Sequence, residues 1–279
     1  MKQPPETRRS APLSHAEFLS AADAIHGKIE RANKHIGELR ALIERFLDSD
    51  PYHIIYEGDV NTGKRHVRWS APEPVPLMVS IIAGDVLHCL RSALDHLYAL
   101  LVAVHGYALD RGDQFPIHDT AKAYEDARSR IVARVGPDAL KLLDALEAYK
   151  GGCDAIWRLH RLNIIDKHRA LMTIGITGQG RRLLKHMPEE PATLPNERTD
   201  PIAIPMSLLP LLKHGDILER DIPHEKAGDE VNLTVEIALD EPGVVEAEPL
   251  IQTLDRMLEV IEKTVERILF APLAWPTGP

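Results

Sequence analysis

Cysteine is scarce in this sequence, which contains only Cys89 and Cys153 among 279 residues. Two thiols cannot build a disulfide framework, and we expect both to be reduced, as in cytoplasmic proteins. Residues 1–13 lack the apolar run of a signal peptide. An uninterrupted hydrophobic run of membrane-spanning length is also not expected, because charged and histidine side chains interrupt the most apolar stretch, 79–104. These features predict a cytoplasmic protein that does not associate with a membrane.

An excess of positive charge is lacking as well. The formal net charge is −9 at pH 7, which argues against a protein that coats nucleic acid through bulk electrostatic attraction. This charge still permits an enzyme with a local basic site, provided that its arginines are concentrated there. Hydrophobic residues make up 44% of the chain and charged residues 27%, which is ordinary for a folded protein with a sizeable core.

Apolar residues recur at helical spacing through most of the chain, and the longest pattern begins at residue 14. Ser14 followed by Glu17 is a capping box, which predicts a helix N-terminus there. Gly106 is suited to end the second long pattern. The predicted helices are 14–48, 77–105, 120–134, 137–149, 154–168 and 249–270.

Alternating patterns typical of strands occupy two other stretches. Residues 52–69 contain two strand-like segments around a turn-rich centre, which predicts a β-hairpin, and further strands are expected within 170–240. The glycine-rich run 175–180 lacks the Lys-Ser/Thr of a phosphate-binding loop, so we interpret it as a turn between strands. The predicted fold is α+β and mainly α, a long-helix bundle with a small antiparallel β-sheet formed by the hairpin and the later strands.

The length of the chain fits one generous domain. We expect a flexible N-terminus over residues 1–13 and a single domain over residues 14–279. In this domain the helical bundle comprises 14–50, 77–168 and 249–270, and the β elements comprise 52–69 and 170–240.

The segment 84–97 has the clearest arrangement of polar side chains. With about 100° of rotation per residue, Ser92, Arg91 and Asp95 fall within about 60° of His88 and form one stripe with it. Apolar residues cover the opposite side of the helix. A polar stripe that ends inside a helical bundle is either a buried structural network or a site. In the structural case Arg91 and Asp95 form an i,i+4 ion pair.

A second segment, 157–169, repeats this spacing. The matched pairs are His160 with His88, Asn163 with Arg91, Lys167 with Asp95, and His168 with His96. If the two helices pack face to face, Asp95 and Lys167 are complementary in charge and the two stripes line one cleft. We therefore take both segments together as the candidate site.

Residues 84–169 resemble a family of bacterial helical proteins with no assigned activity. The resemblance is carried by Gly84-Asp85, by Leu90-Arg-Ser-Ala-Leu-Asp-His-Leu97, by Phe115-Pro-Ile117, by Leu146 and Tyr149, by Asn163, and by Asp166-Lys-His-Arg169. It implies that these residues belong to one arrangement, and it implies no particular reaction.

The stretch Arg91-Ser-Ala-Leu-Asp-His96 is also similar to the Arg-x4-6-His signature of HEPN domains. These are helical bundles that often act as metal-independent ribonucleases, in which the Arg and His of two protomers converge on the RNA phosphate. The resemblance implies that Arg91 stabilises charge developing on phosphorus. It implies that His96 transfers the proton of the 2′-hydroxyl or of the leaving oxygen, and that Asp95 orients one of them. His88 completes the candidate catalytic set, and the supporting residues are Asn163, Asp166, Lys167 and His168.

Two other interpretations stay open. One is a metal site, because the two segments offer nitrogen and oxygen ligands; its candidates are His88, Asp95, His96, His160, Asp166 and His168. The other is a non-enzymatic module that binds a partner or itself through its long helices, with the polar stripes fixing helix register. The hypothesis carried forward is a phosphodiester-cleaving site without metal or cofactor, with RNA and a second copy of the chain as candidate partners.

Overall fold

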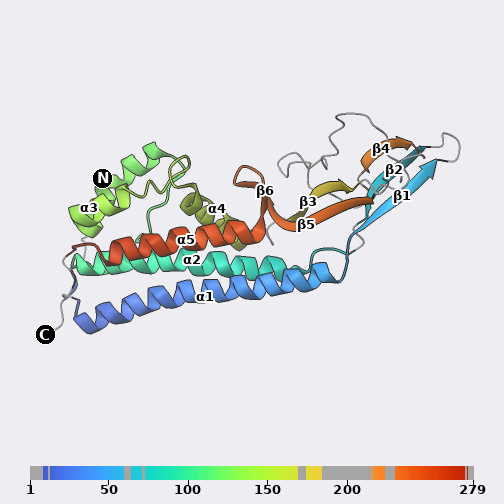
Figure 1. Cartoon of the computed structure of the whole chain (residues 1–279). Coiled ribbons are helices and arrows are strands. Elements are labelled where there is room, and N and C mark those ends of the chain that lie inside the picture. The colour runs from blue at the N-terminus through green and yellow to red at the C-terminus, as the bar shows by residue number, and fades with distance from the viewer. Residues whose placement is uncertain are drawn as a thin grey trace, which may run out of the picture. The chain divides into compact units, whose positions relative to one another are not determined.

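The computed structural model describes residues 9–11, 13–59, 64–70, 73–168, 174–183, 215, 217–223, 230–273 and 275 (Figure 1). The chain forms two compact units, which we describe separately. Unit 1 consists of Met1–Leu39, Ser80–Met172 and Ile251–Pro279, and unit 2 consists of Arg40–Val79 and Thr173–Leu250. The fold is α+β and mainly α, as predicted. The assignment of residues 14–279 to a single domain stays a prediction, and residues 1–8 lie outside the described part of the chain.

Five helices are present in the described residues, at positions close to those predicted. They are α1 (His15–Asp48), α2 (Leu77–Val104), α3 (Ala121–Asp144), α4 (Asp154–His168) and α5 (Leu250–Leu269). The capping box at the start of α1 is confirmed, because the backbone N–H of Ser14 donates to the Glu17 carboxylate at 2.9 Å and the Glu17 N–H donates to Ser14 Oγ at 3.3 Å. Local sequence therefore sets where this helix begins.

Helix α3 contains the boundary that the sequence predicts between two shorter helices. Gly136 has φ of 81°, a left-handed conformation that interrupts the helix just before Pro137. A Cβ atom at Gly136 would lie 2.8 Å from the His105 ring, so the close approach also requires glycine. The second part ends at Asp144, five residues before the predicted end, and the chain then turns toward α4.

Helix α2 is the central helix of unit 1, and Figure 1 shows α1 and α5 running alongside it. Four leucines of its apolar face are fully buried: Leu87, Leu90, Leu94 and Leu97. By length and composition α2 could also span a membrane, so the expectation that its charged residues rule this out stays a prediction. The helix is apolar enough because leucine, valine and alanine outweigh those charges, and more than half of the apolar window is buried inside the protein.

Unit 2 carries two three-stranded antiparallel sheets. One sheet contains the predicted hairpin, β1 (His53–Asp59) and β2 (Lys64–Ser70), joined by β4 (Ile217–Pro223). The other contains β3 (Ile174–Leu183), β5 (Glu230–Glu241) and β6 (Val245–Pro249) in that order. The interpretation of 175–180 as a turn is wrong, because this run lies inside β3 and pairs with β5 residue by residue. Regular pairing with a long partner strand overrides the turn preference of its glycines.

Candidate functional site

The two polar segments of the candidate site face each other in unit 1. Arg91 Nε on α2 lies 3.3 Å from His160 Nδ1 on α4. Two turns earlier on α2, Gly84 lies against Asp166, since a Cβ atom at Gly84 would be 2.7 Å from the Asp166 carboxylate oxygens. The two contacts run in opposite directions along the two helices, so α2 and α4 pack in an antiparallel register.

This register separates two residues that the sequence analysis pairs. Asp95 lies eleven residues beyond Gly84, which is about 16 Å along the helix axis, whereas Lys167 follows Asp166 at the Gly84 end. The Lys167 side chain is exposed. The expected charge complementarity between Asp95 and Lys167 is therefore wrong, because it requires parallel helices.

Arg91 is buried, with 4% of its surface exposed, and each of its three nitrogens has a partner. Nε donates to His160 Nδ1, Nη1 donates to Asp95 Oδ1 at 2.6 Å, and Nη2 donates to the carbonyl of Phe115 at 3.3 Å. Asp95 Oδ1 also accepts the backbone N–H of Phe115 at 2.9 Å. The Arg91–Asp95 pair thus holds both the backbone N–H and the backbone carbonyl of Phe115, which lies in the loop between α2 and α3.

The same loop is fixed further along by a second buried ion pair. Arg134 on α3 donates from Nε to Asp113 Oδ1 at 2.9 Å, and its Nη2 donates to the Ala108 carbonyl at 2.7 Å. The side chains of both Arg134 and Asp113 are less than one-tenth exposed. The guanidinium also lies over the Tyr107 ring, 5.2 Å from its centroid. These contacts hold the loop against α3 independently of Arg91.

Between this loop, α2, α3 and α4 lies a pocket of about 210 Å³, the Arg91 pocket. Its lining consists of Arg91, Tyr98, Gly112, Gln114, Phe115, Pro116, Ile117, His118, Ala127, Arg130, Ile131 and His160. Two arginines, two histidines, a tyrosine and a glutamine supply its polar groups, and none of the described residues that line it is a carboxylate. Arg130 is held at the pocket by donating to the Gly112 carbonyl at 2.8 Å.

The histidines of this pocket are neutral donors and acceptors rather than cations. Burial, reinforced by the charges of Arg91 and Arg161, lowers the pKa of His160 to about 4. Its Nδ1 accepts from Arg91, so the neutral ring carries its proton on Nε2. Burial also lowers the pKa of His118, with Asp119 acting in the opposite direction. Burial lowers the pKa of Arg91 too, opposed by Asp95, yet an arginine stays charged at pH 7.

Several predicted site residues lie elsewhere. His96 is exposed, and at five residues from Arg91 it points about 140° away around the helix. Within one chain Arg91 and His96 therefore do not meet. His88 and His168 are exposed as well, and His88 acts on Asp166 only through its charge.

Asn163 and Asp166 occupy the buried side of α4. Asn163 is 4% exposed, and its Oδ1 has no hydrogen-bond partner among the described residues. Burial, followed by repulsion from Asp85, raises the pKa of Asp166, whereas His88 and Lys167 act to lower it. Asp166 thus belongs to the packing between α2 and α4, and Asn163 is a buried residue of α4.

The six candidate metal ligands are dispersed between the buried contact and the exposed helix faces. Among the residues that the structure describes, no group of three or more His, Cys, Asp or Glu side chains is placed to hold a metal ion. The metal interpretation accordingly has no arrangement of ligands in its support.

Two residues of the pocket, His118 and Arg130, were missed as site residues. Phe115-Pro-Ile117 belongs to the resemblance given above, and its position next to His118 was the one available signal for that side of the pocket. Nothing in the pattern of α3 separates Arg130 from its neighbours Arg128 and Arg134. Only the tertiary structure places one of these arginines in the lining of the Arg91 pocket.

Comparisons with protein-family models, with curated proteins and with solved structures find no match to this chain. The resemblances to a bacterial helical family and to HEPN domains stay predictions. The case for a function therefore rests on the geometry of the Arg91 pocket.

The contact between Gly84 and Asp166 generates a first prediction. Alanine is favoured over glycine inside a helix by about 1 kcal/mol, but at position 84 its methyl group meets the Asp166 carboxylate. We expect Gly84→Ala to raise the free energy of unfolding when Asp166 is also replaced by alanine. In the wild-type background the same substitution should change the free energy of unfolding less favourably, by about 1 kcal/mol or more. Denaturant unfolding of the four proteins measures this coupling, and additive effects would contradict the contact.

The neutral His160 generates a second prediction, on pH. Between pH 6.5 and about 4 the unfolded chain takes up a proton at His160 that the folded chain does not. Stability contributed by the neutral ring is therefore lost as the pH falls through this window. The free energy of unfolding should fall between pH 7 and pH 4.5, and we expect His160→Gln to make this fall smaller by about 1–2 kcal/mol, after allowance for solvent around the half-buried ring. Denaturant unfolding of both proteins at the two pH values measures the difference. Equal pH dependence of wild type and variant would show that the ring titrates normally.

Proposed function

We propose that the Arg91 pocket binds an oxyanion, and that its biological ligand is a phosphate group of RNA. The observation that carries this proposal is the lining of the pocket, in which every charged side chain is an arginine and no described residue is a carboxylate. Phosphate oxygens accept hydrogen bonds, and arginine presents several N–H donors in a fixed plane that suits them. The geometry thus favours an anionic ligand over a cationic or apolar one.

The internal contacts do not use every N–H donor of the residues that line the pocket. Arg91 has five N–H groups and uses three, and Arg130 uses one on the Gly112 carbonyl. The Nε2–H of neutral His160 adds a donor whose tautomer Arg91 fixes. A buried oxyanion requires such a set of preoriented donors.

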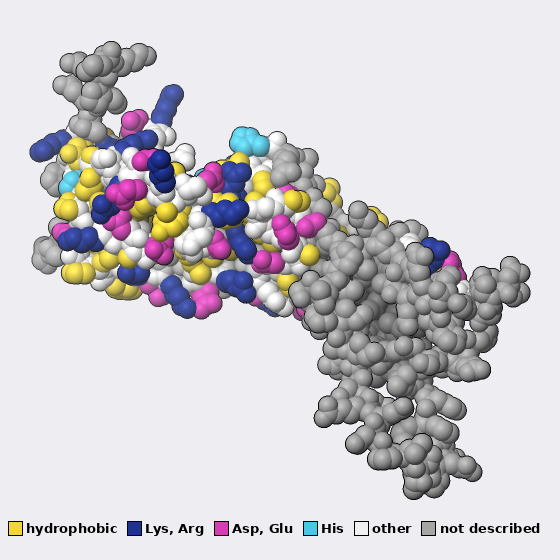
Figure 2. Space-filling view, turned by 90° about the horizontal axis from the view of Figure 1, so that it is seen from above, with side chains coloured by type: hydrophobic (Ala, Val, Ile, Leu, Met, Phe, Trp, Pro, Cys, Tyr) yellow, Lys and Arg dark blue, Asp and Glu magenta, His cyan; other side chains and the backbone are white. Residues whose placement is uncertain are grey.

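The rest of the molecule carries no excess of positive charge, so attraction of an anion depends on the pocket alone. The net charge is −9, and Figure 2 shows acidic and basic side chains interspersed on the visible face of unit 1. Non-specific attraction of a polyanion is therefore weak. The volume of about 210 Å³ is below that of pockets for drug-sized ligands, about 300–1,000 Å³, so the pocket itself would hold the phosphate group and the rest of the RNA would lie outside it.

Phosphodiester cleavage is the reaction that we propose for this site. Arg91 and Arg130 would stabilise the charge on the phosphate. The neutral His118 ring would accept the proton of the 2′-hydroxyl as its oxygen attacks phosphorus. The bond from phosphorus to the 5′-oxygen would then break, leaving a 2′,3′-cyclic phosphate, and the leaving 5′-oxygen would take a proton from water. With its pKa near 4, His160 would donate a hydrogen bond to the phosphate rather than a proton. His96 would reach such a phosphate only from a second copy of the chain, as the HEPN resemblance implies.

Binding of inorganic phosphate tests the pocket itself. We expect Arg130→Ala to weaken phosphate binding about 10- to 100-fold, because a charge-assisted hydrogen bond of about 1.5–3 kcal/mol is lost. Arg267→Ala is the matched control, since Arg267 is exposed on α5 and outside the pocket. Calorimetric titration of the three proteins measures the difference. An absence of phosphate binding by the wild type, or an equal effect of both variants, would remove the proposed function.

Cleavage of a short oligoribonucleotide tests the reaction. We expect the wild type to cleave it and His118→Ala to lower the rate at least about 100-fold through loss of the general base. His96→Ala distinguishes a site within one chain from a site completed by a second copy, because the variant should lower the cleavage rate only in the second case. A lowered rate should then occur together with a dimer of the protein in solution. A wild-type protein that binds phosphate but leaves RNA intact would reduce the proposal to binding alone.

A non-enzymatic helical module is the second candidate, and one observation favours it. The Arg91–Asp95 pair holds the N–H and C=O of Phe115, a structural role that needs no ligand. On this interpretation the pair positions the loop for a partner protein, or for a second copy. The phosphate titration separates the two candidates, since a purely structural pair predicts no phosphate binding.

A further inference from the structure

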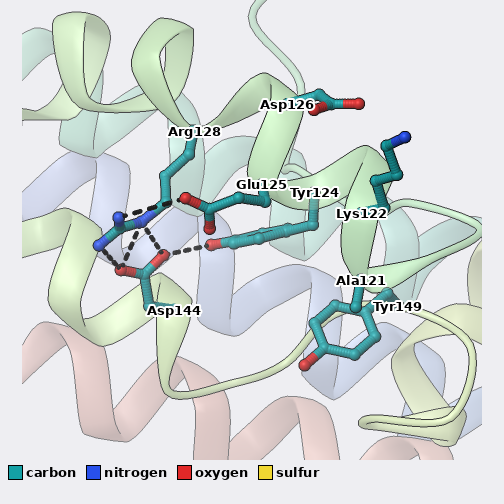
Figure 3. A pocket seen from close by; sticks show the side chains of 8 residues that line it. All are labelled: Ala121, Lys122, Tyr124, Glu125, Asp126, Arg128, Asp144 and Tyr149. Atoms are coloured by element: carbon teal, nitrogen blue, oxygen red, sulfur yellow. Dashed lines mark hydrogen bonds and ion pairs between the residues drawn. The ribbon is translucent and has the colours of Figure 1, made fainter.

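A second hollow, of about 580 Å³, lies on unit 1 next to the Arg91 pocket, and we call it the Tyr149 hollow (Figure 3). Its lining consists of Ala121, Lys122, Tyr124, Glu125, Asp126, Arg128, Asp144 and Tyr149. Its volume lies within the usual range for small-molecule sites, about 300–1,000 Å³. None of the residues of this hollow takes part in the site described above.

The two hollows share a wall. His118 lines the Arg91 pocket, and its ring packs edge-on against Tyr124 of the Tyr149 hollow, with ring centroids 5.7 Å apart. The backbone of His118 forms a bridge with Tyr149, and its N–H donates to the Ala148 carbonyl at 3.0 Å. One residue of the cationic pocket, His118, thus contacts two residues that line the aromatic hollow.

The chemistry of the two hollows differs. Three carboxylates line the Tyr149 hollow, Glu125, Asp126 and Asp144, against two cations. Asp144 already accepts from Tyr124 Oη at 3.1 Å and from Arg128 at 2.9 Å, and Figure 3 shows these three groups pointing toward one another. The remaining carboxylate oxygens accept hydrogen bonds, so the hollow suits a ligand part that carries N–H or O–H donors and no negative charge.

Tyr149 adds a flat surface to this hollow. Its ring is half-buried, and its hydroxyl donates to Glu147 at 3.2 Å, which fixes the ring at one edge. A Cβ atom on Gly152 would lie 2.9 Å from the ring, so the turn between α3 and α4 supports it from one side. On its other side the ring contacts Tyr124, with ring centroids 6.0 Å apart and the two planes at 54°. An aromatic ring held in this way is a platform on which a planar group can stack.

We infer that the two hollows together bind a nucleotide, with the phosphate in the Arg91 pocket and the nucleoside in the Tyr149 hollow. This inference rests on the proposed function and names its ligand class. The ligand must carry an anion at one end and a planar group with hydrogen-bond donors at the other. A ribonucleotide meets these conditions, because the base stacks on Tyr149 and its amino group or the ribose hydroxyls donate to the carboxylates.

The experiment compares three probes by calorimetric titration of the full chain: inorganic phosphate, ribose 5-phosphate and adenosine monophosphate. We expect adenosine monophosphate to bind the wild type at least about fivefold more tightly than ribose 5-phosphate, the gain of stacking one base. This comparison needs no variant. Weaker or equal binding of adenosine monophosphate, repeated with cytidine, guanosine and uridine monophosphates, would overturn the inference.

Variants of Tyr149 locate the effect. Tyr149→Ala is expected to remove the gain for the nucleotide and to leave inorganic phosphate binding unchanged, whereas Tyr149→Phe keeps the flat ring and the gain. Phe270→Ala is the matched control, an exposed aromatic residue outside both hollows. If phosphate binds but Tyr149→Ala has no selective effect, the Tyr149 hollow is not the nucleoside site and the oxyanion proposal stands. If phosphate itself does not bind, both proposals fail.

Discussion

The burial of one guanidinium group organises the candidate site. A charged group removed from water is costly unless hydrogen bonds and an opposite charge replace its hydration. Arg91 meets this requirement with partners on three different elements, Asp95 on its own helix, His160 on α4 and the Phe115 carbonyl in the loop. Satisfying this one side chain therefore brings α2, α4 and the loop together, and the space left between them is the Arg91 pocket.

The protonation of His160 follows from the same contact. A second positive charge beside buried Arg91 is unfavourable, so the ring stays neutral and accepts from Arg91 through Nδ1. The pocket then contains arginine charge without the proton uptake that a normal histidine would add near pH 6. Asp95 compensates part of this charge from outside the lining, and since every charged side chain of the lining itself is an arginine, an oxyanion is the ligand that suits the pocket best.

The walls of the pocket do not depend on Arg91 alone. The buried pair of Arg134 and Asp113 fixes the loop to α3, and the His118–Tyr124 contact fixes the loop where it passes to the Tyr149 hollow. A site held by several independent contacts keeps its geometry when it is empty, which lowers the cost of ordering it around a ligand. This arrangement also places a cationic pocket and an acidic, aromatic hollow on either side of one histidine, a division of chemistry that matches the two ends of a nucleotide.

The sequence by itself determined the local structure and one face of each site helix. The capping box at Ser14, the bounds of α4 and the stripe with Arg91 and Asp95 follow from short-range spacing, because a helix brings residues three and four apart together wherever it is placed. The pairing of Asp95 with Lys167 failed for a related reason. A polar stripe indicates which face of a helix packs against its partner. The spacing of its residues does not indicate whether the partner helix runs parallel or antiparallel. Only the tertiary structure decided the direction of α4, the placement of Arg130 and His118 in the lining of the Arg91 pocket, and the exposure of His96. These depend on contacts between residues far apart in the sequence, which residue spacing within one helix does not encode.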